Sequence, residues 1–310
     1  MPGSEAEAPG SEARAVWRFD AIGTPWEIVT AGPLPDAMRR DVAAAIDAFD
    51  RAWSRFRPDS LVTALAGGGG GSVEAPADAA AMLDAFGALS DATGGAVNPL
   101  VGASLEALGY DAEYRFGSTG FVPGEPVAPP ANWRDLVGWD DHRLTVREPV
   151  LLDVGALGKG QLVDLVLALV HADSKGDVVV DASGDLAVRG AAQRIGLEHP
   201  FDRRRAIGVW EVTDAALCAS ATNRRAWGDG LHHVLDARTG LPVRTVAATW
   251  AVAPRAMHAD AVATALFFDG GPRLAHEWGV EWVRMSTDGR VEWSSGCRAE
   301  LFTRGDSVGS

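Results

Sequence analysis

The chain has 310 residues, of which 47% are hydrophobic, a length that allows one large domain or two modest ones. It contains 28 Lys and Arg residues and 42 Asp and Glu residues, which gives a formal net charge of −14. This charge argues against nucleic acid or an anionic membrane surface as the main partner, because proteins bind both chiefly through Lys and Arg. The same charge means that an anionic substrate would need a local cation, such as a metal ion.

Other global features narrow the class of protein further. No apolar run approaches the roughly 20 residues of a membrane span. The two cysteines, Cys218 and Cys297, are too few for a disulfide scaffold or a Cys-based zinc site. Residues 1–14 are acidic and rich in Gly, Pro and Ala, without the basic and apolar segments of a signal peptide. We therefore expect a cytoplasmic protein with a disordered N-terminal tail over residues 1–14.

The spacing of apolar residues outlines the secondary structure. In the first half of the chain it predicts two strands over 15–30, helices over 35–56 and 77–93, and a strand over 144–154. A helix over 159–170 follows, and then strands over 177–188, 207–212, 231–235 and 245–253. The last predicted elements are a helix from residue 259 and two short strands over 280–293. Strands and helices mix without a regular alternation, and no internal repeat is present. This pattern is typical of an α+β fold.

Local signals mark the ends of some of these elements. Asp36 is a plausible N-cap for the first helix, and Gly94-Gly95 is a C-cap signal for the second. The five glycines of 67–71 would suit a phosphate-binding loop, but no Gly-Lys-Ser/Thr follows them. We therefore expect a flexible surface connection there.

The strongest local signal lies in residues 151–160. An apolar strand ends at Asp153, turns through small residues and starts a helix with Lys159 in its first turn. Because a helix N-terminus presents free N–H groups and a partial positive charge, a lysine there suits a bound anion such as phosphate. A glycine-rich turn with a solvated lysine is equally consistent with this spacing.

A second signal is the segment 258–264. On a helix, Asp260 and Thr264 lie four residues apart and face the same way. A carboxylate and a hydroxyl on one face, beside a backbone carbonyl, would suit a hard cation such as Mg²⁺, which prefers oxygen ligands. The alternative is that Asp260 only caps the N-terminus of the helix.

A third signal is the segment 231–240, in which His232 and His233 precede an apolar pair and an acidic turn. A histidine here could move a proton or contact a phosphate. A histidine of an edge strand with no special role is equally consistent with the local sequence.

Taken in chain order, these segments and several shorter ones resemble the sequence blocks of the ApbE family, the FAD:protein FMN transferases. The resemblance runs from about residue 21 to residue 268. Its blocks are Ile22-Gly23-Thr24, 56–60, 95–99, 153–164, 181–185, 219–220 with 224–225, 233–240 and 259–264. Each block alone is weak, but the ordered set is specific.

The resemblance implies an α+β fold with a mixed, largely antiparallel sheet core and packed helices. It implies binding of FAD and Mg²⁺, and transfer of the FMN half of FAD onto a Ser or Thr hydroxyl of an acceptor flavoprotein, with release of AMP. The acceptor would carry a segment of the type Asp-x-x-Ser/Thr-Gly-Ala-Ser/Thr. A central domain over 15–303 would lie between the N-terminal tail and a C-terminal tail over 304–310.

The resemblance also assigns roles to residues. Asp260 and Thr264 would bind Mg²⁺ together with the carbonyl of Ala156. His233 would handle a proton or contact phosphate, and Asp260 would take part in catalysis through the metal. The FAD site would be lined by Ile22, Phe56, Ala96, Asn98, Asp153, Lys159 and Val234. The acceptor hydroxyl needs a base, for which His233 and Asp236 are the candidates.

The chain departs from the family pattern at several positions. Ile22 stands in place of the usual Met, Phe56 in place of Tyr, Asn98 in place of Asp and Ala237 in place of Pro. None of these changes removes a metal ligand. Many family members are exported lipoproteins with a lipobox cysteine, which is absent here, so either the acceptor is cytoplasmic or the N-terminus of this sequence is incomplete. Two other functions are compatible with the same residues: storage of FAD without transfer, and Mg²⁺-dependent hydrolysis of FAD to FMN and AMP.

Overall fold

The structure is a computed structural model, and it describes residues 14–112, 115, 122–174, 176–224, 226–227, 230–302 and 306–308. Its centre is a nine-stranded sheet in the order β1-β2-β6-β7-β10-β15-β16-β17-β19. Neighbouring strands are antiparallel except for the parallel pair β17 and β19. The strands are β1 (Ala15–Ala21), β2 (Thr24–Thr30), β6 (Val178–Asp181), β7 (Asp185–Arg189), β10 (Ala216–Ala221), β15 (Val246–Ala253), β16 (Glu281–Ser286), β17 (Val291–Ser294) and β19 (Asp306–Val308).

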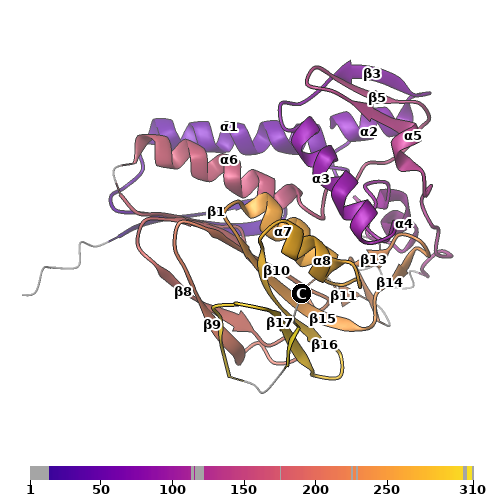
Figure 1. Cartoon of the computed structure of the whole chain (residues 1–310). Coiled ribbons are helices and arrows are strands. Elements are labelled where there is room, and N and C mark those ends of the chain that lie inside the picture. Colours follow the sequence, from indigo (N-terminus) through magenta and orange to yellow (C-terminus); the bar gives the residue numbers. More distant parts are fainter. Residues whose placement is uncertain are drawn as a thin grey trace, which may run out of the picture.

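Helices cover one face of this sheet. The long helices α1 and α6 lie side by side, and α7 packs between α6 and the central strands (Figure 1). The helices are α1 (Asp36–Trp53), α2 (Leu61–Gly67), α3 (Ala79–Ala92), α4 (Gly102–Ala107), α5 (Trp133–Leu136), α6 (Gly158–Asp173), α7 (Ala256–Ala265) and α8 (Gly271–Glu277). Leu162, Val166 and Val262 are fully buried in the core between these helices and the sheet.

A smaller sheet covers part of the opposite face. It consists of β18 (Glu300–Leu301), β9 (Ala206–Val212) and β8 (Gln193–Glu198), in that order. Trp210 of β9 packs with Leu217 and Val252 of the central sheet in a second core. Because both faces of the central strands are covered, every residue of β15 is buried, and the usual alternation of buried and exposed positions is lost.

The remaining strands are short. A three-stranded sheet has β5 (Arg143–Val146) between β3 (Gly71–Glu74) and β4 (Val137–Trp139), and it lies beyond the end of the long helices (Figure 1). Two two-residue pairs are formed by β11 (Ala226–Trp227) with β12 (Leu231–His232) and by β13 (Leu235–Asp236) with β14 (Leu241–Pro242). No helix within the described ranges is long and apolar enough to span a membrane.

The α+β class and the largely antiparallel sheet are confirmed, but several expected boundaries are wrong. Asp36 lies in the first turn of α1, and Pro35 holds the cap position. The expected strand over 144–154 ends at Val146, because beyond it the chain continues without strand pairing. The expected strand over 177–188 is divided into β6 and β7 by a turn, and the one over 231–235 is broken at His233. Gly71 belongs to β3 rather than to a flexible connection.

Candidate functional site

One pocket of about 850 Å³ lies where the helical layer, the central sheet and the smaller sheet meet. It is lined by residues from the β1–β2 turn, the end of α1, the N-terminus of α6, the β6–β7 turn and α7. Apart from Asp236, the residues proposed for the site from the sequence all line this pocket: Ile22, Phe56, Ala96, Asn98, Asp153, Ala156, Lys159, His233, Val234, Asp260 and Thr264. Residues that are up to 242 positions apart in the chain are therefore brought to one cavity, since 264 − 22 = 242.

The crossing of α6 and α7 places the buried carboxylate of the site. Asp260 is 4% exposed, and its Oδ2 accepts a hydrogen bond from the backbone N–H of Gly160 at 2.9 Å. The helices approach closely because Gly160 has no side chain: a Cβ there would lie 2.3 Å from the carbonyl oxygen of Ala256 and 2.7 Å from the Cβ of Asp260. Asp260 is the fifth residue of α7, so the alternative that it caps this helix is wrong.

Two further oxygen-bearing groups that line the pocket with Asp260 are in contact with each other. Thr264 lies one turn after Asp260 on α7, and its Oγ1 donates to the carbonyl oxygen of Ala156 at 3.1 Å. In an octahedral Mg²⁺ site with bonds near 2.1 Å, neighbouring ligand oxygens lie about 3.0 Å apart. No group of three or more His, Cys, Asp or Glu side chains suited to a metal is present among the described residues. A cation here would therefore be held by one carboxylate, a hydroxyl, a carbonyl and water, which fits Mg²⁺ rather than Zn²⁺.

Lys159, in the first turn of α6, points to the β6–β7 turn. Its Nζ lies 2.9 Å from Oδ2 of Asp185, and it donates to the carbonyl oxygens of Ala182 at 3.1 Å and Ser183 at 3.3 Å. An ammonium group has three donors, and these three acceptors use all of them. Lys159 is thus not the solvated lysine of the simpler interpretation. It is already paired with a carboxylate that is 3% exposed, so it contributes little net positive charge by itself.

Cys218 lies behind these carboxylates. Burial, together with the negative charges of Asp185 and Asp260, raises the pKa of the Cys218 thiol well above its usual range. The thiol is fully buried and its Sγ lies 3.4 Å from the carbonyl oxygen of Ala256. This cysteine therefore stays protonated and acts as a core residue rather than as a nucleophile.

The other end of the pocket is aromatic. The rings of Phe56 and Tyr110 meet edge to face with centroids 5.4 Å apart, and Tyr110 stacks on Trp227 at 5.4 Å. The guanidinium of Arg55 lies 4.2 Å from the centroid of Phe56 and 4.9 Å from that of Tyr110. Rings and a planar cation arranged in this way provide a surface on which a flat heteroaromatic group can stack.

Arg55 also orients the carboxylate of Asp153. Its Nε donates to Oδ2 of Asp153 at 2.6 Å, and its Nη1 donates to the carbonyl oxygen of Tyr110 at 2.6 Å. The other carboxylate oxygen of Asp153 accepts from the N–H of Gly155 at 2.7 Å. The Arg55 side chain is 2% exposed, yet its Nη2 has no hydrogen-bond partner among the described residues. A buried donor without a partner is costly, and this one lines the pocket.

The two adjacent histidines have different surroundings. His232 is buried, its Nε2 lies 2.7 Å from the carbonyl oxygen of Val243, and its Nδ1 accepts from the N–H of Val234 at 3.3 Å. Burial lowers the pKa of His232 below its usual value. His233 is half-buried and lines the pocket, whereas His232 does not. His233 is therefore the histidine of this pair that lines the pocket, and it is the one to which the family resemblance assigns a role.

Ile22 lines the pocket from the turn between β1 and β2. It has φ of 46°, and Gly23 after it has φ of 73°, so the two residues form a two-residue hairpin turn of the kind that needs positive φ at both positions. Asn or Gly usually occupies the first position, and a β-branched residue there is strained. Strain of this kind is typical of functional sites.

Ala96 and Asn98 reach the pocket through a segment that is bonded to the protein. The Asn98 amide donates to the carbonyl oxygen of Pro130 at 2.9 Å and accepts from the N–H of Leu100 at 2.9 Å. The carbonyl oxygen of Ala96 accepts from the N–H of Ala237 at 3.0 Å. Asp236, considered above as a base, does not line the pocket and pairs with Arg238 at 2.6 Å, which holds the pKa of its carboxyl below the usual range.

The structure adds residues that the sequence did not single out. Arg55, Leu105, Tyr110, Glu198 and Arg203 line the pocket. None of them lies in a recognisable motif; only the position of Arg55 next to Phe56 was a hint. Arg225, which the sequence placed in a block with Arg224, lies outside the described residues.

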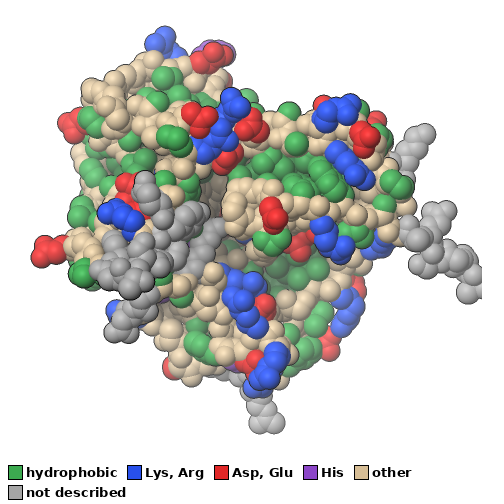
Figure 2. All heavy atoms as spheres, turned by 180° about the vertical axis from the view of Figure 1, so that it is seen from behind, with side chains coloured by type: hydrophobic (Ala, Val, Ile, Leu, Met, Phe, Trp, Pro, Cys, Tyr) green, Lys and Arg blue, Asp and Glu red, His purple; other side chains and the backbone are tan. Residues whose placement is uncertain are grey.

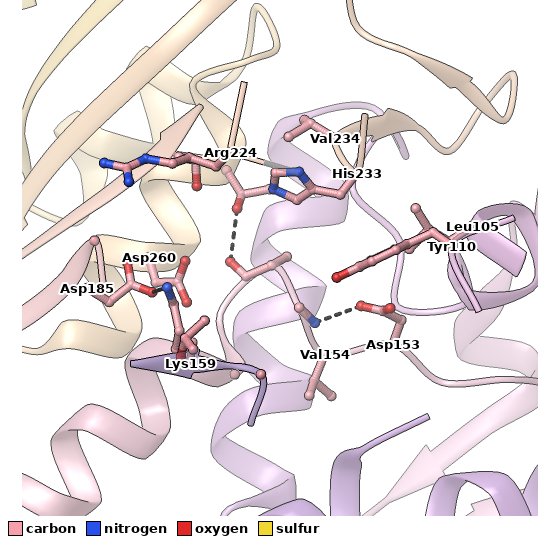
Figure 3. Close-up of a pocket in the computed structure, with 18 of the residues that line it drawn as sticks. Leu105, Tyr110, Asp153, Val154, Lys159, Asp185, Arg224, His233, Val234 and Asp260 are labelled. Atoms are coloured by element: carbon pink, nitrogen blue, oxygen red, sulfur yellow. Dashed lines mark hydrogen bonds and ion pairs between the residues drawn. The ribbon is translucent and has the colours of Figure 1, made fainter. Parts of the chain in front are cut away.

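The pocket has two chemically different ends. Figure 3 shows Lys159, Asp185 and Asp260 together on one side, and Tyr110, Leu105 and Asp153 on the other, with His233 between them. Seen from behind, the molecule is hollowed near its centre, with Lys and Arg side chains around the hollow (Figure 2). This arrangement suits a long ligand with a flat aromatic part and an anionic part.

Comparison with known proteins finds relatives of this chain. The chain is 29% identical to a protein of Rhodobacter capsulatus named FAD:protein FMN transferase, with 91% of this chain covered, and it spans 57% of the length of that relative. It is also 29% identical to a protein of the same name from Treponema pallidum, with 78% of this chain and 75% of the relative covered.

Among solved structures, the fold is similar to the crystal structure of the ApbE protein from Thermotoga maritima, with a TM-score of 0.78 and 23% identity, covering 92% of this chain and 98% of that one. The family comparison matches residues 22–283, a range that contains every residue proposed for the site. The chain belongs to the ApbE family.

Proposed function

We propose that this protein is an FAD:protein FMN transferase that depends on Mg²⁺. It would transfer the FMN half of FAD to a Ser or Thr hydroxyl of an acceptor flavoprotein and release AMP. The names of two relatives, both FAD:protein FMN transferase, support the reaction class. The observation that carries the proposal is that one pocket contains both the oxygen-bearing groups of Asp260, Thr264 and Ala156 and an aromatic surface, with His233 between them.

The metal site would consist of the Asp260 carboxylate, the Thr264 hydroxyl and the Ala156 carbonyl. The 3.1 Å distance between the last two oxygens and the burial of Asp260 support this assignment. Bound Mg²⁺ would neutralise charge on the pyrophosphate and stabilise the leaving phosphate, an effect of several kcal/mol on the barrier. Such a cation is needed here because Lys159 is already paired with Asp185.

The N-terminus of α6 would support the same charge. Its first N–H groups lie in the stretch of Gly158, Lys159 and Gly160, beside the proposed metal ligands. The N–H of Gly158 donates to the carbonyl oxygen of Val154 and that of Gly160 donates to Asp260, so the helix dipole, rather than free N–H groups, favours an anion at this position. Arg224, which lines the pocket on the opposite side, would add a positive charge near the phosphates (Figure 3).

The aromatic end would hold one of the two flat ring systems of FAD. Phe56 and Tyr110 would contact the ring, and the Nη2 donor of Arg55 would gain an acceptor that the described residues do not provide. Asp153, held by Arg55 and Gly155, retains lone pairs with which to accept from the ligand. Ile22, Ala96, Asn98 and Val234 would complete the walls.

His233 would receive the proton of the acceptor hydroxyl. The hydroxyl oxygen would form a bond to the phosphorus of the FMN half, the bond from this phosphorus to the bridging oxygen would break, and AMP would leave with that oxygen. A half-buried histidine that lines the pocket suits this role. The acceptor hydroxyl would be presented on a segment of the type Asp-x-x-Ser/Thr-Gly-Ala-Ser/Thr.

The test is AMP release from FAD and Mg²⁺, with and without a small acceptor domain carrying this segment, followed by the intact mass of the acceptor. We expect the acceptor to gain the mass of one FMN unit with a matching amount of AMP. AMP without a gain in mass would favour hydrolysis of FAD, and bound FAD without either product would favour a storage protein. Either of those results would overturn the proposal.

A further inference from the structure

The mouth of the pocket carries a group of arginines, of which only Arg224 has a role in the pocket chemistry proposed above. The β8–β9 connection contains Arg203, Arg204 and Arg205 in succession, and Arg224 lies beside it after β10. We call these four residues, together with Phe201, the arginine lip. Arg203 and Arg224 line the pocket, whereas Phe201, Arg204 and Arg205 do not. The lip therefore extends from the pocket mouth onto the outer surface.

The lip is a defined structure rather than a loose loop. The N–H of His199 donates to the carbonyl oxygen of Arg205 at 2.9 Å. The N–H of Arg205 donates to the carbonyl oxygen of Asp202, also at 2.9 Å. Arg224 is tied to the same loop through an ion pair with Glu198 at 3.1 Å. A surface that is already ordered loses little conformational freedom when a partner binds.

The charge of the lip differs in sign from that of the whole chain. Its four arginines face two carboxylates: Glu198 is shared by Arg203 and Arg224, and Asp202 pairs with Arg204 at 3.3 Å. No acidic side chain among the described residues lies within ion-pair distance of Arg205, so two positive charges remain in a chain of net charge −14. Because salt screens charges beyond about 8 Å, a partner near the lip senses this local positive field.

The lip also exposes contact area. The Phe201 ring is 60% exposed, and the side chains of Arg203 and Arg204 are 64% and 91% exposed. Aromatic residues and arginines are enriched in protein interfaces. A ligand inside the pocket can reach Arg203 and Arg224 but has no use for an outward-facing Phe201 or Arg204.

We propose that the arginine lip docks an acidic segment of the acceptor protein, so that the acceptor hydroxyl enters the pocket beside His233. This inference rests on the proposed function, because it names the surface that the acceptor uses. The acidic segment is attracted at the lip and repelled by the acidic remainder of the surface, which directs the approach of the acceptor.

The experiment measures FMN attachment at saturating FAD and Mg²⁺ as a function of acceptor concentration. The acceptor is a domain carrying the Asp-x-x-Ser/Thr-Gly-Ala-Ser/Thr segment with Asp and Glu residues on either side. In the double variant Arg204→Glu/Arg205→Glu we expect the KM for the acceptor to rise about tenfold or more, with kcat and the FAD dissociation constant within twofold of wild type. The wild-type kcat/KM should fall with added salt, and that of the variant should not.

Three controls separate docking from other effects. Arg143→Glu/Arg147→Glu makes the same charge change on exposed residues at the start of β5 and just after its end, away from β8 and β9 (Figure 1), and it should change the acceptor KM less than twofold. Arg205→Glu alone disturbs no ion pair with a described residue and should give part of the effect. An acceptor with Lys in place of its flanking acidic residues should bind the Arg204→Glu/Arg205→Glu enzyme better than it binds the wild-type enzyme.

The outcomes are distinguishable. An acceptor KM that is unchanged in both lip variants, or changed equally in the Arg143/Arg147 control, overturns the docking proposal while leaving the transferase proposal intact. Wild-type protein that attaches no FMN to any acceptor overturns the proposed function, and the docking proposal with it.

Discussion

Helices α6 and α7 cross near their N-termini, and each N-terminus is bonded by a carboxylate from the other helix. Asp164 of α6 accepts from the N–H groups of Ala256 and Met257 at 2.8 and 3.1 Å. Asp260 of α7 accepts from the N–H of Gly160 at 2.9 Å. The two contacts are nearly reciprocal, and both satisfy N–H groups that a helix leaves without partners.

The surroundings of the two carboxylates are different. Asp164 lies 3.4 Å from the guanidinium of Arg255 and does not line the pocket. Asp260 lines the pocket together with Thr264 and Ala156. The same local hydrogen bond thus serves stability at one crossing point and holds a candidate metal ligand at the other. The two carboxylates differ in their other neighbours: Asp164 lies beside Arg255, whereas Asp260 lines the pocket.

The sharpest way to test this comparison is to neutralise each carboxylate in turn. Asp260→Asn keeps an oxygen that can accept from Gly160 but removes the charge that would bind Mg²⁺. We expect AMP release to fall about a thousandfold, because the electrostatic stabilisation lost amounts to several kcal/mol, with the melting temperature little changed. The measurement is a Mg²⁺ titration of AMP release, with circular dichroism to confirm folding.

Asp164→Asn is the matched control. Loss of this cap should lower the free energy of unfolding by about 1 kcal/mol, while AMP release stays within a few-fold of wild type. If the two variants lose activity equally, or if Asp260→Asn retains full Mg²⁺-dependent activity, the division between a structural and a metal-binding carboxylate is wrong.

The next variant changes the crossing itself. In Gly160→Ala the added methyl would lie 2.3 Å from the carbonyl oxygen of Ala256, which is backbone and cannot move aside cheaply. We expect the helices to separate, a loss of stability of about 1–3 kcal/mol, and a fall in AMP release of roughly a hundredfold because Asp260 and the α6 N-terminus shift apart. Thermal unfolding and steady-state AMP release measure the two effects.

Gly67→Ala provides the comparison for a helical glycine. Gly67 ends α2, and a Cβ there would meet no atom within 4 Å. This variant should be neutral or slightly stabilising, with unchanged activity. A Gly160→Ala protein as stable and active as Gly67→Ala would show that the close approach of α6 and α7 is not required.

The sequence predicts helices α6 and α7, but it does not predict that they pack against each other. Helical spacing places Asp260 and Thr264 on one face, and the glycine-rich stretch predicts the start of α6. Neither pattern reveals that Gly160 packs on Ala256, because nothing local encodes which helices become neighbours. The same limit explains Lys159: the sequence places it in a first turn, but its pairing with Asp185 depends on the β6–β7 turn.

The strands show where local patterns mislead. β10 lies at the centre of the sheet, yet its sequence ALCASA lacks the β-branched residues that mark a strand, and it was not expected. Leu152 and Val154 are apolar because they are packed in the core, not because they pair in a sheet. Arg55 and Tyr110 were missed since their roles come from a contact between distant segments. Cytoplasmic location, and the division into two tails and a central domain, stay predictions.

The smallest expected effect concerns Ile22, in the turn at the pocket's edge. A β-branched residue with φ of 46° is strained, by about 1–2 kcal/mol relative to a residue that tolerates this conformation. In Ile22→Asn we therefore expect the free energy of unfolding to rise by about 1 kcal/mol, while FAD binding weakens about tenfold through loss of an apolar contact. Chemical denaturation and FAD titration measure these opposite changes.

Ile22→Met separates the two causes, because it restores an unbranched apolar side chain at the same position. It should bind FAD within a few-fold of wild type and gain less stability than Asn, since Asn favours positive φ and Met does not. If Ile22→Asn instead lowers stability, the turn is not strained, and the isoleucine contributes to packing as an ordinary apolar residue. If stability rises and FAD binding is unchanged, the strained residue does not contact the ligand, and the pocket wall on this side must be assigned to Phe56 and Val234 instead.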